Sequence, residues 1–404
     1  MPKAMFKQKS APAKGSTSGG DFGYLPPEIC YFDSACQTLR PQPVIDAQDD
    51  YYLHYNACGG RVKYHWGAQV DAKVREARQL LLEFAGKRAP EYVVAFTLNT
   101  TYGINLVLHQ LPVGVFKRIV TTDIEHNSVM LPSITWAKRN GTERKVLSRE
   151  DDGTITYASG DLDKSVVLIN SVSNIDGRSP SNLKQLAADA HAAGGILLVD
   201  AAQGFTHDVK PLRETDFDAA FGSGHKMYGP SVGFIIIKRS LLKRLEPFFI
   251  GGGMVTDARE DTFDLLREGE EAHAILEPGL QNWAGIIGLG AAIQWLNKQP
   301  AEKHERALAE ALFAGLQKMP RVQMLNHRPS PIVSLSVDGI DAHRLALYLD
   351  EQNIMCRSGH FCCHAYLQHK RELPPQLRVS LGLYNTTEQI QHFLKTLDHI
   401  FRTL

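Results

Sequence analysis

The chain has 404 residues, of which 43% are hydrophobic and 22% are charged, and these proportions exclude a disordered chain and fit two or three globular domains. Lys plus Arg and Asp plus Glu each number 44, so a net charge of zero argues against nucleic acid or a membrane surface as a partner. Six cysteines are too few for a disulfide scaffold in a chain of this length.

The N-terminal segment, residues 1–20, is rich in Lys, Ser, Gly and Pro and lacks the apolar run of a secretory signal. We expect it to be a disordered tail, and we expect residues 21–45 to contribute to a small domain. No later stretch reaches the run of about 18 apolar residues that a membrane span requires. The expected location is the cytoplasm, where the cysteines would be reduced.

Between about residues 65 and 240, short apolar runs bounded by turn residues alternate with segments of helical length. This alternation predicts βαβ units and a mostly parallel sheet that is buried on both faces. A helix over 182–193, ended by Gly194 and Gly195, precedes a strand over 196–200. The other predicted strands cover residues 92–97, 118–121, 166–170, 217–222 and 232–237.

The pattern changes near residue 290, where helices alternate with a few short strands. We therefore predict a large α/β domain over residues 46–290 and a smaller α+β domain over 291–404. The helices of the smaller domain are predicted over 288–299, 301–319, 341–352 and 387–404, and its strands over 321–325 and 332–337.

Three local motifs together indicate one cofactor. Lys226 lies in the glycine-rich segment SGHKMYGP after an apolar strand, where it could bind an aldehyde or could be an ordinary surface lysine. Asp200 ends a predicted strand and could pair with a pyridinium N–H or cap the next turn. Thr100 and Thr101 follow another strand and could bind a phosphate or cap a helix. Together these features predict pyridoxal phosphate.

At this point the sequence resembles a known family. From YFDSA at residues 31–35 to RVSL at residues 378–381, it is similar to the cysteine desulfurase and selenocysteine lyase group of class V aminotransferases, which are fold-type I pyridoxal-phosphate enzymes. The resemblance implies a large domain with a mostly parallel, seven-stranded type of sheet, a smaller α+β domain and a homodimer.

The resemblance also assigns roles to individual residues. Lys226 corresponds to the Schiff-base lysine, Asp200 to the partner of the pyridine nitrogen, and Gln203 to the donor to the ring oxygen. The ring-stacking residue is His126, and the substrate residues are Asn174 and Arg378, the latter holding the carboxylate. The phosphate ligands are Thr100, Thr101, Ser223 and His225.

The segment CRSGHFCCH at residues 356–364 aligns with the cysteine loop of this group and makes Cys362 the expected nucleophile. Arg357 and His360 could lower the pKa of its thiol, and Arg357 is also expected to contact the substrate. Two other interpretations stay open, namely small buried hydrophobes and a metal cluster. If the loop is extended, Cys363 points away from Cys362.

Several positions depart from the pattern of the group. Leu280 stands where a threonine usually reaches the phosphate of the neighbouring subunit, and Phe361 replaces the second histidine of the loop. Cys36 stands where the group usually has Ala or Thr. Arg178 is an unexpected charge near Asn174. These changes lie around the expected entrance of the site.

The implied reaction converts L-cysteine to L-alanine and holds the sulfur as a persulfide on Cys362, for transfer to an acceptor such as a scaffold protein for iron–sulfur clusters. Selenocysteine lyase, C–S lyase and aminotransferase activities occur on the same fold and stay open as alternatives. A non-catalytic sulfur carrier or interaction protein is a further alternative.

Overall fold

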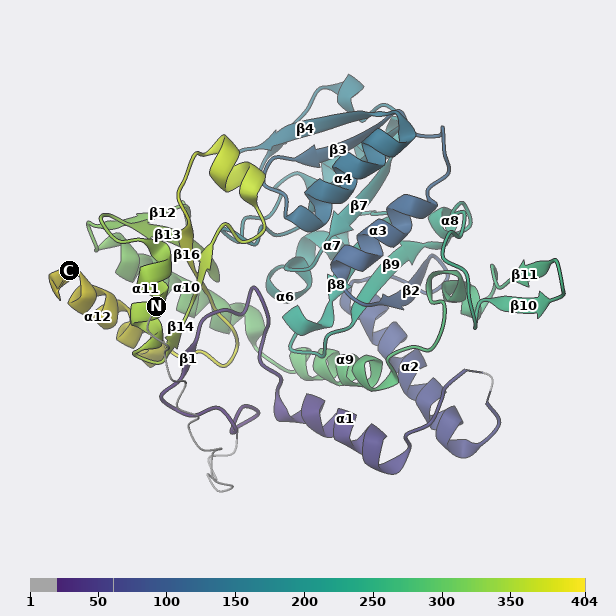
Figure 1. Ribbon diagram of the computed structural model, residues 1–404, viewed down its shortest axis with the longest axis horizontal. Coiled ribbons are helices and arrows are strands. Elements are labelled where there is room, and N and C mark those ends of the chain that lie inside the picture. The colour runs from purple at the N-terminus through teal and green to yellow at the C-terminus, as the bar shows by residue number, and fades with distance from the viewer. Residues whose placement is uncertain (1–19, 61, 404) are drawn as a thin grey trace, which may run out of the picture.

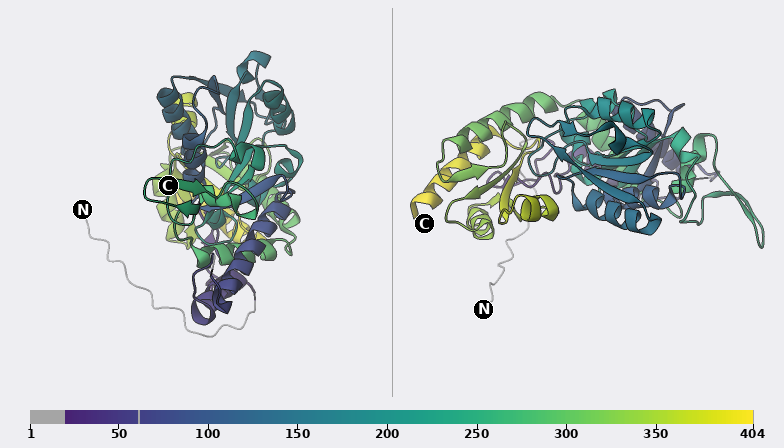
Figure 2. Two further views of the ribbon diagram at one scale, coloured as in Figure 1. Left: turned by 90° about the vertical axis from the view of Figure 1, so that its right-hand side faces the viewer. Right: turned by 90° about the horizontal axis from the view of Figure 1, so that it is seen from above.

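Two main β-sheets, one of eight strands and one of four, each packed with its own helices, organise the chain (Figure 1). The computed structural model describes residues 20–60 and 62–403, so the predicted disordered tail, apart from Gly20, lies outside the described residues. Figure 2 shows the large and small parts side by side, with a hairpin extending from the end of the large part farthest from the small one. The strands of the hairpin are β10 (Val255–Ala258) and β11 (Phe263–Leu265).

The large sheet confirms the predicted α/β class with a mostly parallel sheet. Strands β3, β4, β6, β7 and β8 pair in parallel, whereas β9 runs antiparallel to both of its neighbours. In spatial order the eight strands are β2 (Tyr92–Thr97), β9 (Gly233–Lys238), β8 (Ala219–Ser223), β7 (Ile196–Asp200), β6 (Ser165–Asn170), β3 (Arg118–Thr122), β4 (Glu143–Arg149) and β5 (Ile155–Thr156).

Helices cover both faces of this sheet. Successive residues of a strand point to opposite faces, and the strands carry apolar side chains on both of them. In β2, Val94 and Phe96 belong to one hydrophobic cluster, and Val93 and Ala95 belong to another. The large part contains α1 (Gln42–His54), α2 (His65–Phe84), α3 (Thr100–Gln110), α4 (Asn127–Asn140), α5 (Leu183–Ala192), α6 (Gly204–His207), α7 (Lys210–Glu214), α8 (Arg239–Leu242) and α9 (Trp283–Leu296).

The small sheet has the order β12 (Val322–Met324), β13 (Ile332–Val337), β16 (Gln376–Ser380) and β15 (Arg357–Gly359). Three helices pack with it, namely α10 (Ala301–Gln317), α11 (Ala342–Asp350) and α12 (Thr387–Thr403). From the other end of the chain, β1 (Cys30–Tyr31) joins this part by pairing in parallel with β14 (Ile354–Met355). The segment that follows β1 thereby comes close to the cysteine loop. No helix within the described ranges is long and apolar enough to span a membrane.

Candidate functional site

The predicted cofactor residues gather where the central strands of the large sheet end. Asp200 is the last residue of β7 and Ser223 the last of β8, while Thr100 begins α3 shortly after β2. Parallel strands present their carboxyl ends at one edge, which is where open α/β sheets bind ligands. The topology therefore brings together three motifs that are up to about 120 residues apart.

The hydroxyl groups expected to bind phosphate lie at the N-terminus of α3. Ser223 Oγ accepts a hydrogen bond from Thr100 N at 2.9 Å and lies 2.7 Å from Thr100 Oγ1. Thr101 Oγ1 lies 2.6 Å from Ser128 Oγ, which in turn lies 2.8 Å from His126 Nδ1. The N–H groups at a helix N-terminus attract anions, so this arrangement fits a phosphate. Ser128, two residues from His126, was not among the predicted residues.

Asp200 is buried and Lys226 is half-buried, and the two groups act on each other electrostatically. Burial lowers the pKa of Lys226, and the charge of Asp200 opposes that effect. Burial likewise raises the pKa of Asp200, and Lys226 opposes it. Asp200 Oδ1 accepts a hydrogen bond from Ala202 N at 3.0 Å. An amine with a lowered pKa is suited to react with an aldehyde.

His126 and His225 are kept neutral by their surroundings. Burial, aided by the charges of Lys226 and Arg378, lowers the pKa of His126 to about 3. His126 Nδ1 also accepts a hydrogen bond from Ser128 N at 3.0 Å, as the N-cap of α4. Burial, together with Lys226 and Arg40, lowers the pKa of His225 to about 4. An uncharged His126 ring is suited to stack on an aromatic cofactor.

These residues fit pyridoxal phosphate. Gln203 donates from Nε2 to Ala35 O at 2.7 Å, but its Oε1 is buried without a hydrogen-bond partner among the described residues. A buried carboxylate, an amine with a lowered pKa, an unsatisfied amide oxygen and a hydroxyl pair at a helix N-terminus are complementary to a phosphorylated pyridine ring. In such a fit, Lys226, Asp200 and Ser223 would supply the groups for the aldehyde, the ring nitrogen and the phosphate.

The cysteine loop docks on this edge from the small part. Asn127 N, at the start of α4, donates to Cys362 O at 2.7 Å, and Asn174 Nδ2 donates to Phe361 O at 2.9 Å. Cys362 is exposed, whereas Cys363 is buried and donates from Sγ to Asn174 Oδ1 at 3.1 Å. Burial raises the pKa of Cys363 well above its usual value.

The loop is not extended, contrary to the condition under which Cys363 was expected to point away. Phe361 and Cys362 have φ angles of 50° and 57°, and Cys363 N donates to His360 O at 2.8 Å. This left-handed turn exposes one thiol and buries the other. Residues that carry a Cβ atom rarely adopt positive φ angles. The hydrogen bonds from Asn127 and Asn174 therefore stabilise the turn.

Asp33 connects the two arginines expected to bind substrate. Its carboxylate accepts hydrogen bonds from Arg378 Nη2 at 3.1 Å and from Arg357 Nε at 2.9 Å. Arg378 also donates from Nη1 to Asn174 O at 3.1 Å, and its buried Nε has no partner within the described part of the chain. Arg357 does not bond to Cys362 in the described contacts; it donates from Nη2 to Cys36 Sγ at 2.8 Å.

The structure shows where two of the positions that depart from the pattern of the group, Arg178 and Leu280, are placed. Arg178 is buried in an ion pair, because its Nη2 lies 2.6 Å from Asp176 Oδ2, so it supports the fold beside Asn174. The side chain of Leu280 is 78% exposed. Among the described residues, no group of three or more His, Cys, Asp or Glu side chains could hold a metal ion.

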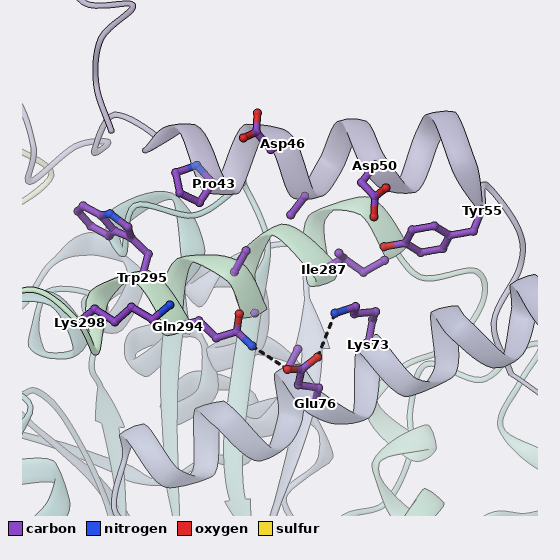
Figure 3. A pocket seen from close by; sticks show the side chains of 14 residues that line it. Pro43, Asp46, Asp50, Tyr55, Lys73, Glu76, Ile287, Gln294, Trp295 and Lys298 are labelled. Carbon is purple, nitrogen blue, oxygen red and sulfur yellow. Dashed lines mark hydrogen bonds and ion pairs between the residues drawn. The ribbon is translucent and has the colours of Figure 1, made fainter. Parts of the chain in front are cut away.

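A groove of about 450 Å³ lies elsewhere, between α1, α2 and α9 (Figure 3). In Figure 3, Glu76 bridges Lys73 and Gln294 across the floor of this groove. None of the predicted site residues lines it. The groove is therefore separate from the site at the sheet edge.

Comparisons with known proteins agree with this geometry. The chain matches the family described as aminotransferase class-V over residues 30–393. A probable cysteine desulfurase of Pyrococcus abyssi is 33% identical over 399 residues, which cover 94% of this chain and 96% of the relative. The structure of a cysteine desulfurase from Thermococcus onnurineus has a TM-score of 0.85 at 31% identity, covering 93% of this chain and 96% of the other. A cysteine desulfurase from Escherichia coli has a TM-score of 0.83 at 25% identity, with coverage of 95% and 97%.

Proposed function

The chain belongs to the class-V aminotransferase family and to its cysteine desulfurase group, and on that premise we propose how its own residues release sulfur from L-cysteine. It is a pyridoxal-phosphate-dependent enzyme whose substrate is cysteine. The observation that carries the proposal is the hydrogen bond from Asn127 N to Cys362 O at 2.7 Å. Asn127 follows His126, the expected ring-stacking residue, so this bond holds the exposed Cys362 next to the cofactor residues.

We assign the holding of the cofactor to the residues at the sheet edge. Asp200 would pair with the ring nitrogen, His126 would stack on the ring, and Gln203 would donate to the ring oxygen. Pyridoxal phosphate, when bound, supplies an electron-withdrawing ring that makes the substrate Cα–H acidic. The phosphate ligands are Thr100, Thr101, Ser223 and His225.

Substrate binding falls to Arg378 and Asn174. The guanidinium of Arg378 is positioned by Asp33 and by Asn174 O, and its unpartnered Nε is a free buried donor. A carboxylate is a suitable acceptor for it, because charge-assisted hydrogen bonds are the strongest of their kind. Arg357, bonded to Asp33 as well, adds positive charge beside this position.

The proton and sulfur transfers use Lys226 and Cys362. Burial lowers the pKa of Lys226, which favours the neutral amine that can accept the Cα proton at Nζ. Cys362 Sγ, as a thiolate, then attacks the substrate sulfur. An S–S bond forms as the Cβ–S bond breaks, and the electron pair stays with the carbon fragment, which is protonated to L-alanine.

The partners of the enzyme are also part of the proposal. The exposure of Cys362 supports transfer of the persulfide sulfur to a thiol on an acceptor or scaffold protein. A homodimer is supported by three consecutive exposed apolar side chains, Phe248, Phe249 and Ile250, which form a patch of the kind that partners cover. Light scattering of the purified protein tests the dimer.

A single reaction mixture tests the activity. Alanine, sulfide, pyruvate and transaminated keto acid are quantified after incubation with L-cysteine and, in parallel, with selenocysteine. Alanine with protein-bound sulfur is expected from cysteine, and it should disappear in Cys362→Ala while the cofactor stays bound. Pyruvate would indicate a lyase, amino transfer would indicate a transaminase, and turnover retained by Cys362→Ala would refute the assignment of the nucleophile.

A further inference from the structure

Cys36 lies on the segment that follows β1, next to residues that bond to the site. Its neighbours are tied to predicted cofactor residues, because Ala35 O accepts from Gln203 Nε2 at 2.7 Å and Thr38 N donates to His225 O at 2.9 Å. Cys36 N donates to Asp33 O at 3.0 Å, so the segment is turned at this point. The backbone on both sides of Cys36 is thus held against the cofactor position.

The thiol of Cys36 is bonded to a cation. Arg357 Nη2 lies 2.8 Å from Cys36 Sγ, and Asp33 orients the same guanidinium through Arg357 Nε at 2.9 Å. A neighbouring guanidinium stabilises a thiolate, or the terminal sulfur of a persulfide, through charge and hydrogen bonding. Cys36 is half-buried, whereas Cys30 and Cys363 are buried.

Cys36 and Cys362 border the same arginine. Arg357, which bonds to Cys36, shares the Asp33 carboxylate with Arg378, whose Nη2 lies 3.1 Å from Asp33 Oδ1. On the side of the loop, the ring of Phe361, the residue before Cys362, lies 4.8 Å from the Arg378 guanidinium. Cys36 is thus linked to Arg378 through Arg357 and Asp33, and Cys362 follows the residue whose ring packs on Arg378, the residue expected to bind the substrate carboxylate.

The other thiols are less suited to sulfur chemistry. Cys363 is buried and already bonded to Asn174, and burial raises the pKa of both Cys363 and Cys356 well above the usual range. Cys30 is buried as well. Cys58 is exposed, but its Sγ bonds to the neighbouring Gly59 O, away from the residues of the site.

We propose that Cys36 is a second sulfur carrier, which takes the outer sulfur of the Cys362 persulfide within the same protomer. This proposal rests on the desulfurase function proposed above. The Cys36 thiolate attacks the outer sulfur and a new S–S bond forms on Cys36. The bond between that sulfur and Cys362 Sγ breaks, and its electron pair leaves with Cys362 as a thiolate. The exchange needs no external oxidant or reductant.

The consequence is storage of a second sulfur. Once its sulfur has moved to Cys36, Cys362 is free to attack another molecule of cysteine before any acceptor arrives. Arg357 holds the anionic end of the persulfide on Cys36. The first phase of alanine formation in the absence of an acceptor should therefore be about twice as large as in a protein that lacks Cys36.

The test maps sulfur in the holoenzyme. The enzyme reacts with L-cysteine without acceptor, is quenched with an alkylating reagent, and its peptides are analysed by mass spectrometry while alanine is counted in the burst. We expect sulfane sulfur on both Cys362 and Cys36 in the wild type. In Cys36→Ala and Cys36→Ser we expect it on Cys362 alone, with about half the burst. Cys58→Ala should behave as the wild type.

Each other outcome has a distinct meaning. If the wild type makes alanine but carries sulfur only on Cys362, the relay is wrong and the desulfurase function stands. If it makes no alanine, the proposed function itself fails. Persulfide on Cys36 in Cys362→Ser would overturn the order of transfer, because Cys36 would then react with substrate directly.

Discussion

Cys363 donates a hydrogen bond from Sγ to Asn174 Oδ1 at 3.1 Å, and this contact holds one end of the turn that presents Cys362. The same amide holds the other end, since Asn174 Nδ2 donates to Phe361 O at 2.9 Å. One side chain expected to lie beside the substrate thus also shapes the loop that bears the nucleophile. The buried thiol next to Cys362 has a structural role in this arrangement.

Cys363→Ala should destabilise the protein more than Cys363→Ser. Alanine leaves the buried Asn174 Oδ1 without its donor, a loss of about 1–3 kcal/mol, whereas serine keeps a hydroxyl donor. Urea unfolding of the two variants measures the difference. Both should still accumulate persulfide on Cys362, and its absence from Cys363→Ser would contradict a purely structural role for Cys363.

Ser223→Ala should weaken cofactor binding through the phosphate. Loss of one hydrogen bond to a charged group costs about 1.5–3 kcal/mol, which is a roughly 10- to 100-fold rise in Kd. Spectroscopic titration with pyridoxal phosphate and with pyridoxal distinguishes an effect on binding of the phosphate from an effect on binding of the ring. The affinity for pyridoxal should not change.

A matched control is the hydroxyl pair of Ser181 and Thr154, whose oxygens lie 2.9 Å apart outside the site. Ser181→Ala should leave both affinities as in the wild type. An equal loss of affinity for pyridoxal in Ser223→Ala would mean that the serine acts on the ring or on the fold.

Lys226→Ala should abolish alanine formation and the visible absorption band of the lysine-linked cofactor. Binding through the phosphate site should persist, because Thr100 and Ser223 are unchanged. The measurements are the absorption spectrum of the purified variant and the cofactor released on denaturation. Lys210→Ala, which removes an exposed lysine, is the control and should keep band and activity. A retained band in Lys226→Ala would show that the lysine was wrongly assigned.

The buried strands of the large sheet were predictable because they are short, continuously apolar runs. Strands β2 and β7 have the predicted bounds, 92–97 and 196–200. Strand β4 was missed, since its sequence ERKVLSR is mostly charged and half-exposed. The two-residue strand β5 was missed as well, so the sheet has eight strands where the pattern predicted six and the resemblance implied a seven-stranded type.

Helix α9 begins five residues earlier than the predicted start at 288. Glycine lowers helix propensity, and Gly285 obscured the first turn in the sequence. The structure explains the residue, because a Cβ there would approach Val232 Cγ2 to 2.5 Å. Gly285 therefore lets α9 pack closely against Val232, the residue before β9.

Each cofactor motif is a short stretch of sequence at the end of a predicted strand, so its position at the edge of the sheet could be predicted. The contacts among Asp33, Arg357 and Cys36 join residues more than 300 positions apart, and no spacing in the sequence indicates them. They arise because β1 pairs with β14 in the small part. The pairing of β1 with β14 thus determines that Arg357 contacts the thiol of Cys36.

The last prediction concerns pH. His126 has a pKa of about 3 in the folded protein, against an ordinary 6.5, so the unfolded chain binds more protons between these values. Stability is therefore lost as the pH falls below about 6.5, and His126 should contribute roughly 2 kcal/mol less at pH 5 than at pH 7.5. Urea unfolding of the cofactor-free protein at both pH values measures this loss. His126→Asn keeps a cap for α4 but does not titrate, so its loss should be smaller by that amount. An equal loss in both proteins would show that His126 already binds a proton in the folded state.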